Sequence, residues 1–89
     1  MKLIGRDKLK HGAQDVDRWL CAWCSEVAHA NWRRPEDVIE QFPNVRTRPG
    51  GDFLFPIGTS GYCLLLQVAF AHGIALILEM NDFDNHYGR

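Results

Sequence analysis

Residues 53–80, FLFPIGTSGYCLLLQVAFAHGIALILEM, carry most of the information about the fold. Three apolar runs, rich in aromatic and branched side chains, occupy positions 53–55, 62–70 and 74–80. The short glycine-containing segments 58–61 and 71–73 separate these runs, and such segments mark tight turns. The pattern therefore predicts three β-strands joined by hairpins into an antiparallel meander, with His72 in the second turn.

The chain before this stretch has the periodicity of a helix. From Asp7 onward, apolar residues recur at steps of three and four positions, with charged residues between them: Leu9, Val16, Trp19, Leu20, Trp23 and Val27. This spacing predicts an amphipathic helix, interrupted near Gly12. Trp19 and Trp23 are interpreted as core or partner-facing aromatics rather than base-stacking residues, and Trp32 is expected to close the end of the helix over the sheet.

A second, shorter helix is indicated at Pro35. Proline suits the first helical turn, and the acids Glu36 and Asp37 directly behind it complement the helix dipole. Phe42 and Pro43 end this helix. The flanking segments are assigned from short-range signals: residues 2–4 are expected to form a short strand, and residues 44–52 a loop or hairpin turn.

Helices first and hairpin-linked strands afterwards predict an α+β fold, with two N-terminal helices packed on a small antiparallel β-sheet. With 89 residues, of which 46% are hydrophobic, the chain is expected to form a single domain over residues 1–89 with one core. No window of the sequence approaches the roughly 18 apolar residues of a membrane span. Three cysteines and no apolar leader favour reduced thiols and a cytoplasmic location.

The charge balance argues against strong attraction to nucleic acid. The net charge is -1 and the isoelectric point is about 6.4. Residues 1–48 contain nine of the ten Lys and Arg residues and seven of the eleven acids, so the front of the chain is mildly basic and the back is acidic.

The order of motifs resembles the HigB family of the RelE/ParE superfamily over nearly the whole chain. The front half carries Met-Lys-Leu-Ile at 1–4, Ala-Asn-Trp-Arg-Arg-Pro-Glu-Asp-Val at 30–38 and Gln-Phe-Pro-Asn at 41–44. The back half carries Phe-Pro-Ile, a glycine-containing turn and Tyr-Cys-Leu within 55–70, where the family has Phe-Asn-Ile, a similar turn and Tyr-Arg-Leu. The resemblance implies the RelE/ParE-like fold and a toxin of a type II toxin–antitoxin pair. Such a toxin usually enters the ribosomal A site, cleaves mRNA and is silenced by a cognate antitoxin, with no cofactor.

The chain departs from the family at positions that would carry the chemistry. Attack by the RNA 2'-hydroxyl needs a group that takes its proton, a cation near the phosphate and an acid for the leaving oxygen. The family's basic positions fall here on Gly58, Gly61, Cys63 and Gln67, and its last-strand arginine falls near Leu78 or Glu79. Its closing histidine position is Phe83 or Asp84.

The remaining candidates for catalysis are His86 as acid or base, Tyr87 as proton donor and Arg89 as phosphate clamp, with Tyr62 and Gln67 lining the pocket. The alternative is that this tail is solvated or covered by the antitoxin. Candidate RNA-binding cations are Lys8, Lys10, Arg33, Arg34, Arg46 and Arg48, although Arg33 and Arg34 could simply be a solvated helix end.

The spacing of Cys21 and Cys24 is that of a metal or redox pair, but it falls within the predicted helix and lacks a second cysteine pair. Two small buried helix residues explain it better, and no metal site is predicted. Three functions stay open. The first is an mRNA-cleaving toxin, and the second is a degenerate toxin that only binds its antitoxin or acts in a regulatory complex. The third is a relative of the gyrase-targeting members of the superfamily.

Overall fold

The computed structural model describes residues 1–10 and 13–82. Its two helices are α1 (Gln14–His29) and α2 (Pro35–Gln41). The strands of the described chain are β1 (Lys2–Ile4), β2 (Arg46–Thr47), β3 (Phe53–Pro56), β4 (Tyr62–Ala69) and β5 (Ile74–Asp82). Two single 3-10 turns, η1 (Arg6–Lys8) and η2 (Phe70–His72), complete these elements. The α+β fold class is confirmed.

The strands form one sheet in the order β1-β5-β4-β3-β2. The predicted meander is confirmed, since β3 pairs antiparallel with β4, and β4 with β5. The sheet as a whole is mixed, however, because β1 lies parallel to β5. The expectation of a purely antiparallel sheet was wrong on this point. Nearly the whole chain separates β1 from β5, so no tight turn fixes their relative direction.

The structure refines two local assignments. Of the loop or hairpin turn predicted at 44–52, the hairpin is confirmed, because β2 within this segment pairs antiparallel with β3, Arg46 with Leu54 and Thr47 with Phe53. The first helix begins at Gln14 rather than soon after Asp7, because Gly5 takes a left-handed conformation and the backbone turns through η1 before Leu9 extends. Residue 12, where we expected the interruption, lies outside the described residues.

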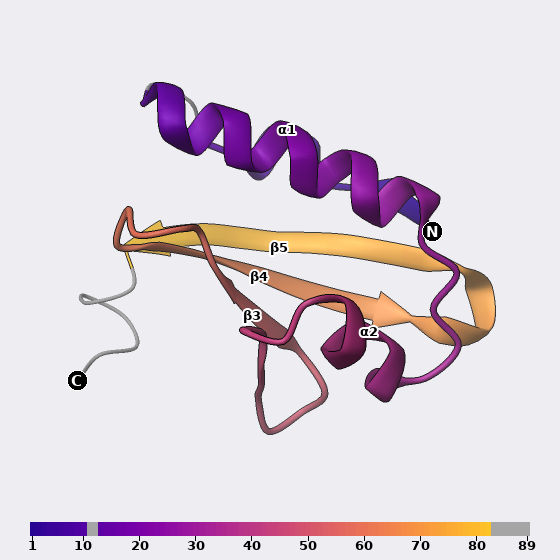
Figure 1. The fold of residues 1–89 in the computed structure, drawn as a ribbon. Helices are drawn as coiled ribbons and strands as arrows, with labels where there is room; N and C mark the ends of the chain where they lie inside the picture. Colours follow the sequence, from indigo (N-terminus) through magenta and orange to yellow (C-terminus); the bar gives the residue numbers. More distant parts are fainter. Residues whose placement is uncertain (11–12, 83–89) are drawn as a thin grey trace.

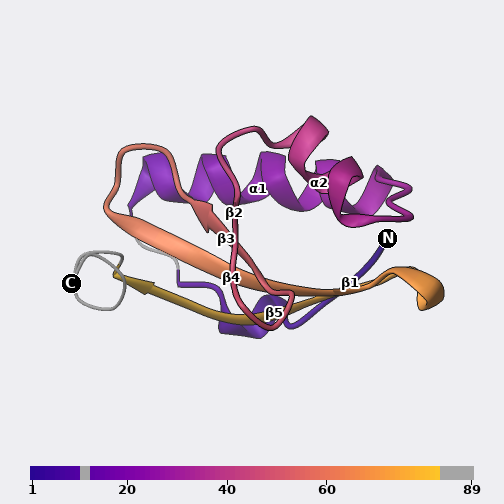
Figure 2. The ribbon, with the colours of Figure 1, turned by 90° about the horizontal axis from the view of Figure 1, so that it is seen from below.

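Both helices cover the same face of the sheet (Figures 1 and 2). α1 buries the apolar stripe that the sequence predicts, namely Val16, Leu20, Trp23, Cys24 and Val27. Neighbouring rings then form a continuous chain of aromatic contacts: Trp19–Trp23, Trp23–Phe55, Phe55–Phe42 and Phe42–Trp32, with centroid distances of 5.3–6.1 Å. This chain joins α1, β3 and the end of α2, so one core fixes the positions of the elements around α1.

The other face of the sheet has a small apolar cluster of its own. Leu54, Cys63 and Leu65 are buried there, and Leu78 packs against them. Along β4, Leu64 and Leu66 belong to the core under the helices, so Cys63 and Leu65 point to the opposite face. This alternation assigns each residue of β4 to one side of the sheet. Neither helix is long and apolar enough to cross a membrane.

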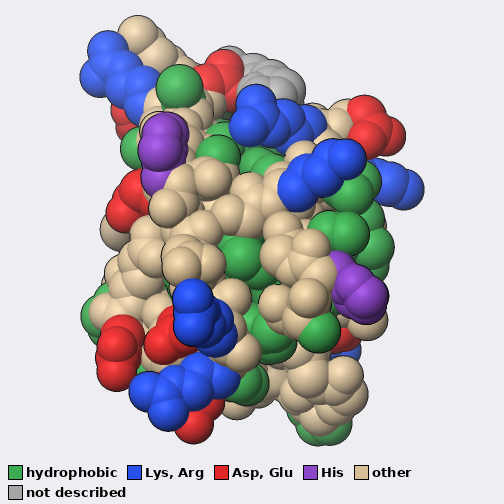
Figure 3. All heavy atoms as spheres, turned by 90° about the vertical axis from the view of Figure 1, so that its right-hand side faces the viewer, with side chains coloured by type: hydrophobic (Ala, Val, Ile, Leu, Met, Phe, Trp, Pro, Cys, Tyr) green, Lys and Arg blue, Asp and Glu red, His purple; other side chains and the backbone are tan. Residues whose placement is uncertain are grey.

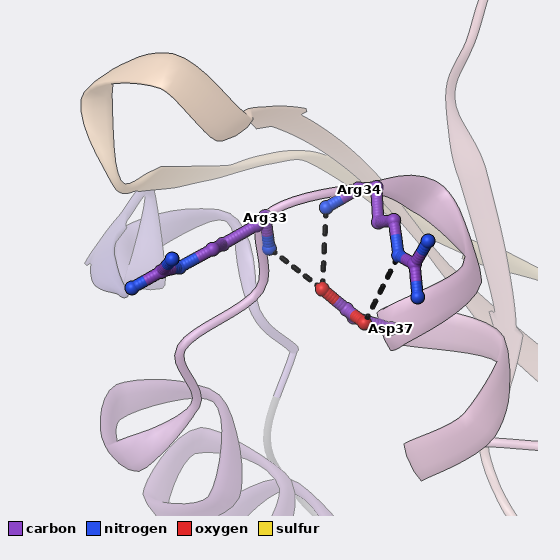
Figure 4. Close-up of polar contacts among 3 residues, drawn as sticks. All are labelled: Arg33, Arg34 and Asp37. Carbon is purple, nitrogen blue, oxygen red and sulfur yellow. Dashed lines mark hydrogen bonds and ion pairs between the residues drawn. The ribbon is translucent and has the colours of Figure 1, made fainter.

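α2 is a two-turn helix whose first turn is held by Asp37. The Asp37 carboxylate accepts hydrogen bonds from the backbone N–H groups of Arg33 (2.8 Å) and Arg34 (3.3 Å), as Figure 4 shows. These bonds lower the pKa of Asp37 from its ordinary value, and the bond from the Arg33 N–H has the largest effect. The nearby Arg34 guanidinium, whose Nε lies 3.7 Å from Oδ1, acts in the same direction. Pro35 at the first helical position is as predicted.

Trp32, between the two helices, is only 3% exposed. Its indole Nε1 donates a hydrogen bond of 2.9 Å to Oε1 of Gln41, the last residue of α2. The ring also packs edge-on against Phe42. Trp32 therefore ties the connection after α1 to the end of α2, a more central role than closing one helix.

Candidate functional site

Two hollows lie side by side along one flank of α1. The first has a volume of about 360 Å³ and is lined by Ala13, Asp15, Val16, Trp19, Ile57, Gly58, Thr59, Ser60 and Tyr62. The second has a volume of about 250 Å³ and is lined by Trp19, Glu26, Gln41, Phe42, Pro43, Asn44, Val45, Phe55 and Pro56. Trp19 belongs to both, and the consecutive residues Pro56 and Ile57 line one each. We call this continuous surface the α1 groove.

The lining of the α1 groove is mainly apolar, and its charged residues, among those the structure describes, are all negative. Its walls include the aromatic rings of Trp19, Phe42, Phe55 and Tyr62. Among the lining residues, the first hollow has one charged side chain, Asp15, and the second has one, Glu26. Both are exposed. Such a surface is suited to apolar groups with adjoining positive charge, and unsuited to a phosphate.

Tyr62 is the one predicted catalytic residue that the described groove contains. It begins β4 and is 38% exposed. The preceding turn holds it in place: the Ser60 hydroxyl donates to the Ile57 carbonyl at 2.6 Å and accepts from the Tyr62 backbone N–H at 3.1 Å. Tyr62 also pairs across the sheet with Asp82, the last described residue. The end of β5 therefore lies next to a residue of the first hollow.

Gln67, the other predicted pocket residue on β4, lies on the opposite face of the sheet from Tyr62. Leu66 and Val68 on either side of it pack toward the helices, so the alternation of β4 turns Gln67 the other way. It is exposed and pairs with Leu76. The structure does not bring Tyr62 and Gln67 together.

The remaining predicted catalytic residues, His86, Tyr87 and Arg89, lie outside the described residues, as do Phe83 and Asp84. Their roles stay predictions. Of the two positions matched to the family's last-strand arginine, Leu78 packs into the small apolar cluster, whereas Glu79 is exposed.

The predicted RNA-binding cations do not form one patch. Lys8 ends η1, which lies alongside β5, and Lys10 follows it along the same strand, where its backbone N–H donates a hydrogen bond to the Met80 sulfur at 3.2 Å. Arg46 and Arg48 belong to the β2–β3 hairpin at the other edge of the sheet. In Figure 3, the side that carries the β4–β5 turn shows Lys and Arg in separate places, with neutral and apolar surface between them.

Arg33 and Arg34, the remaining pair, lie at the start of α2 and are exposed. Arg34 lies against Asp37, whereas the Arg33 side chain points away from it (Figure 4). Both side chains are thus accessible, as either a solvated helix end or a contact with RNA requires.

The local structure suits neutral residues at three of the family's basic positions. Gly58 has a φ of 54° and Gly61 a φ of 86°, a left-handed backbone that favours glycine over lysine or arginine. Cys63 is 1% exposed between Leu54 and Leu65, where a charged side chain would be costly. These substitutions are thus integrated into the turn and the second apolar cluster.

The two helical cysteines differ in environment. Cys24 is buried, which raises the pKa of its thiol, whereas Cys21 is exposed, so only one of them is the small buried residue that we expected. Within residues 1–10 and 13–82, no group of three or more His, Cys, Asp or Glu side chains could hold a metal ion.

The acidic ends of the α1 groove were missed at the sequence level. Asp15, Trp19, Ala22 and Glu26 follow one another at steps of four, three and four, which places them on one stripe of a helix. That spacing could have identified a mixed apolar and acidic stripe. It could not have shown that the 42–45 and 56–62 segments form the opposite wall.

A comparison with curated proteins finds no match. The comparison with family models gives a match to the HigB toxin family, described as the RelE-like toxic component of a toxin–antitoxin system, over residues 17–85. The matched region runs from the first turn of α1 past the end of β5, and it agrees with the helices-on-sheet architecture. The chain belongs to the HigB toxin family and is the toxin component of a toxin–antitoxin system.

Proposed function

We propose that this toxin binds RNA, cleaves mRNA in a ribosome-dependent manner in the cytoplasm, and is neutralised by a cognate antitoxin. Membership of a family of RelE-like toxic components, matched over residues 17–85, is the observation that carries the proposal. The fold adds support, because β5, the last described strand, ends opposite Tyr62, which lines the first hollow.

The chemistry is assigned to the residues that follow β5. His86 takes the proton from the 2'-hydroxyl, or donates one to the leaving oxygen, and Tyr87 orients the reacting groups or donates a proton. Arg89 balances the charge that develops on the phosphate. Tyr62 contributes a phenol at the end of the sheet where β5 ends.

Substrate binding relies on cations that are spread over the molecule. Lys8 and Lys10 at one edge, Arg46 and Arg48 at the other, and Arg33 and Arg34 at the start of α2 contact separate phosphates of an extended RNA surface. The carboxylates of Asp15 and Glu26 repel phosphate from the α1 groove. RNA therefore approaches the sheet end without filling the groove.

Cleavage of a translated mRNA by purified protein and ribosomes, followed by primer extension, tests this assignment. We expect new 5' ends with the natural chain, and a loss of about a hundredfold or more in rate for His86→Ala, the range for removing a general acid or base. His72→Ala is the matched control, because His72 is an exposed histidine in the β4–β5 turn. Equal cleavage by both variants would remove His86 from the mechanism.

A second candidate function is a catalytically degenerate toxin that only binds its antitoxin. The buried, neutral Cys63 and the separation of the cations favour it, because the sheet then presents no concentrated positive charge to a phosphate. This candidate predicts a stable complex with the antitoxin, intact transcripts in the ribosome assay and no growth arrest on induction. Cleavage that disappears with His86→Ala or Tyr87→Phe would eliminate it.

A further inference from the structure

The α1 groove has the properties of a docking surface for another protein segment. It joins two hollows along one helix and exposes aromatic side chains at the surface. Trp19, at its centre, stacks on Trp23 with a centroid distance of 6.1 Å, so its ring is held in place before any partner arrives. Fixed aromatic residues in the middle of a groove are the typical anchors of protein–protein interfaces.

Unpaired charge at the two ends specifies the partner's chemistry. Asp15 and Glu26 have no ion pair with another described residue, and no Lys, Arg or His of the described chain lines the groove. Glu26 also lies in the last turn of α1, where a carboxylate opposes the helix dipole, so its presence has no explanation in the stability of α1. A partner with two positive charges would complement both ends.

The separation of the carboxylates favours a helical partner. Asp15 and Glu26 are eleven positions apart, about 16 Å along the helix axis at 1.5 Å per residue. A facing helix spans that distance with residues i and i+11, which lie on one side. A β-strand needs roughly five residues, and residues i and i+5 of a strand point to opposite sides.

We infer that the α1 groove is the docking site for a basic amphipathic helix of the antitoxin. That helix carries Lys or Arg at positions i and i+11 and apolar residues at i+4 and i+7, which pack on Trp19 and over the small side chain of Ala22. The spacing reads the same in either chain direction, so parallel and antiparallel docking both satisfy it. The inference rests on the proposed neutralisation by an antitoxin, but not on RNA cleavage.

The test uses the purified chain and a synthetic helical peptide with Arg, Leu, Leu and Arg at positions i, i+4, i+7 and i+11. Isothermal titration calorimetry measures its affinity beside that of a control peptide with Glu in place of both arginines. We expect only the arginine peptide to bind, with an affinity that falls as salt is raised. Equal binding of the two peptides, or binding of neither, would overturn the inference.

Variants of the chain then locate the bound peptide. The Asp15→Asn/Glu26→Gln double variant should weaken binding by about tenfold, the combined effect of two exposed ion pairs. Trp19→Ala should weaken it further. The matched control, Asp7→Asn/Glu36→Gln, removes two exposed acids that do not line the groove and should bind as the natural chain does. Because Asp15 and Glu26 are both exposed, the double variant should fold as the natural chain does. Unchanged affinity of this variant for the peptide would contradict the assignment.

The outcome is independent of catalysis. If the peptide binds in the groove while the ribosome assay shows intact mRNA, the docking site stands and the proposed cleavage fails. If mRNA is cut but the peptide does not bind, the proposed cleavage stands and the docking site fails. A short oligoribonucleotide titrated in parallel should not displace the peptide. Displacement would assign the groove to RNA instead, and the Asp15→Asn/Glu26→Gln variant, which removes two like charges, would then bind the oligoribonucleotide more tightly than the natural chain does.

Discussion

At the scale of single residues, Gly5 shows how one position controls the start of the fold. It follows β1, has a φ of 96° and lies so close to β5 that an added Cβ would be 2.6 Å from the Ile77 carbonyl oxygen. This approach lets the chain leave β1 and turn through η1 along β5. Gly50 has a similar φ of 101° but has nothing within 4 Å of an added Cβ.

The pair allows backbone strain to be separated from crowding. Gly50→Ala should cost roughly 1–2 kcal/mol of unfolding free energy, from the left-handed backbone alone. Gly5→Ala should cost that amount plus about 1–3 kcal/mol for overpacking against β5. Urea denaturation of both variants measures the difference. Equal losses would mean that the contact with Ile77 relaxes without cost.

The cysteines give a second prediction at this scale. Cys21 is exposed, whereas Cys24 and Cys63 are buried, and burial raises the pKa of the Cys24 thiol while Arg6 nearby opposes this. The thiolate is the reactive form, so one thiol per native chain should react rapidly with a disulfide reagent at pH 8. Cys21→Ser should abolish that fast phase. A fast phase that survives in Cys21→Ser would show that Cys24 or Cys63 is accessible.

At the scale of elements, the sequence predicted α1, α2 and the meander because each has a strong local pattern. Pro35 with two acids defines the start of α2, and glycine-containing turns separate the three apolar strands. The direction of β1 and the pairing of β2 could not be predicted. Their partners, β5 and β3, are selected by tertiary contacts, and two or three residues contain too little pattern to specify a partner.

The same limit applied to the site. The resemblance led us to expect Tyr62 and Gln67 in one pocket. Side chains alternate along β4, however, so residues 62 and 67, an odd number of positions apart, lie on opposite faces of the sheet. The α1 groove was missed because its two walls come from α1 and from segments far along the chain. Only the stripe on α1 was visible in the sequence.

The stability of α2 should depend on pH through the ionisation of Asp37. The seven residues of α2 bury only Val38, so the helix depends on the Asp37 cap. The folded pKa of Asp37 is lowered, so its contribution to stability is present above the unfolded value of about 3.9 and is lost as the pH falls through the folded pKa. Asp37→Asn should lower the melting temperature at pH 6–7, and the difference from the natural chain should shrink below about pH 4.

Glu36→Gln is the matched control for that experiment, because Glu36 is the adjacent acid and makes no comparable bonds to the backbone. Melting curves followed by circular dichroism at a series of pH values give the comparison. A constant difference between Asp37→Asn and the natural chain across the whole range would show that the ionised carboxylate is not what holds the first turn.

At the scale of the whole molecule, the structure combines a toxin fold with a surface that has little concentrated positive charge. The helices, the sheet and the family match over residues 17–85 agree on the fold. The candidate RNA-binding cations lie at two edges of the sheet and at the start of α2, and the charged residues of the groove beside α1 are acidic. These features are compatible if, as we propose, the residues after β5 carry the chemistry and the groove binds the antitoxin.

Controlled induction of the chain in bacterial cells, with growth and the 5' ends of translated mRNAs followed together, shows whether the chain acts as an mRNA-cleaving toxin. We expect growth arrest with new 5' ends inside coding regions for the natural chain. We expect neither effect for His86→Ala, and both effects for His72→Ala. Continued growth with intact transcripts on induction of the natural chain, at a level of protein confirmed by immunoblot, would contradict this proposal.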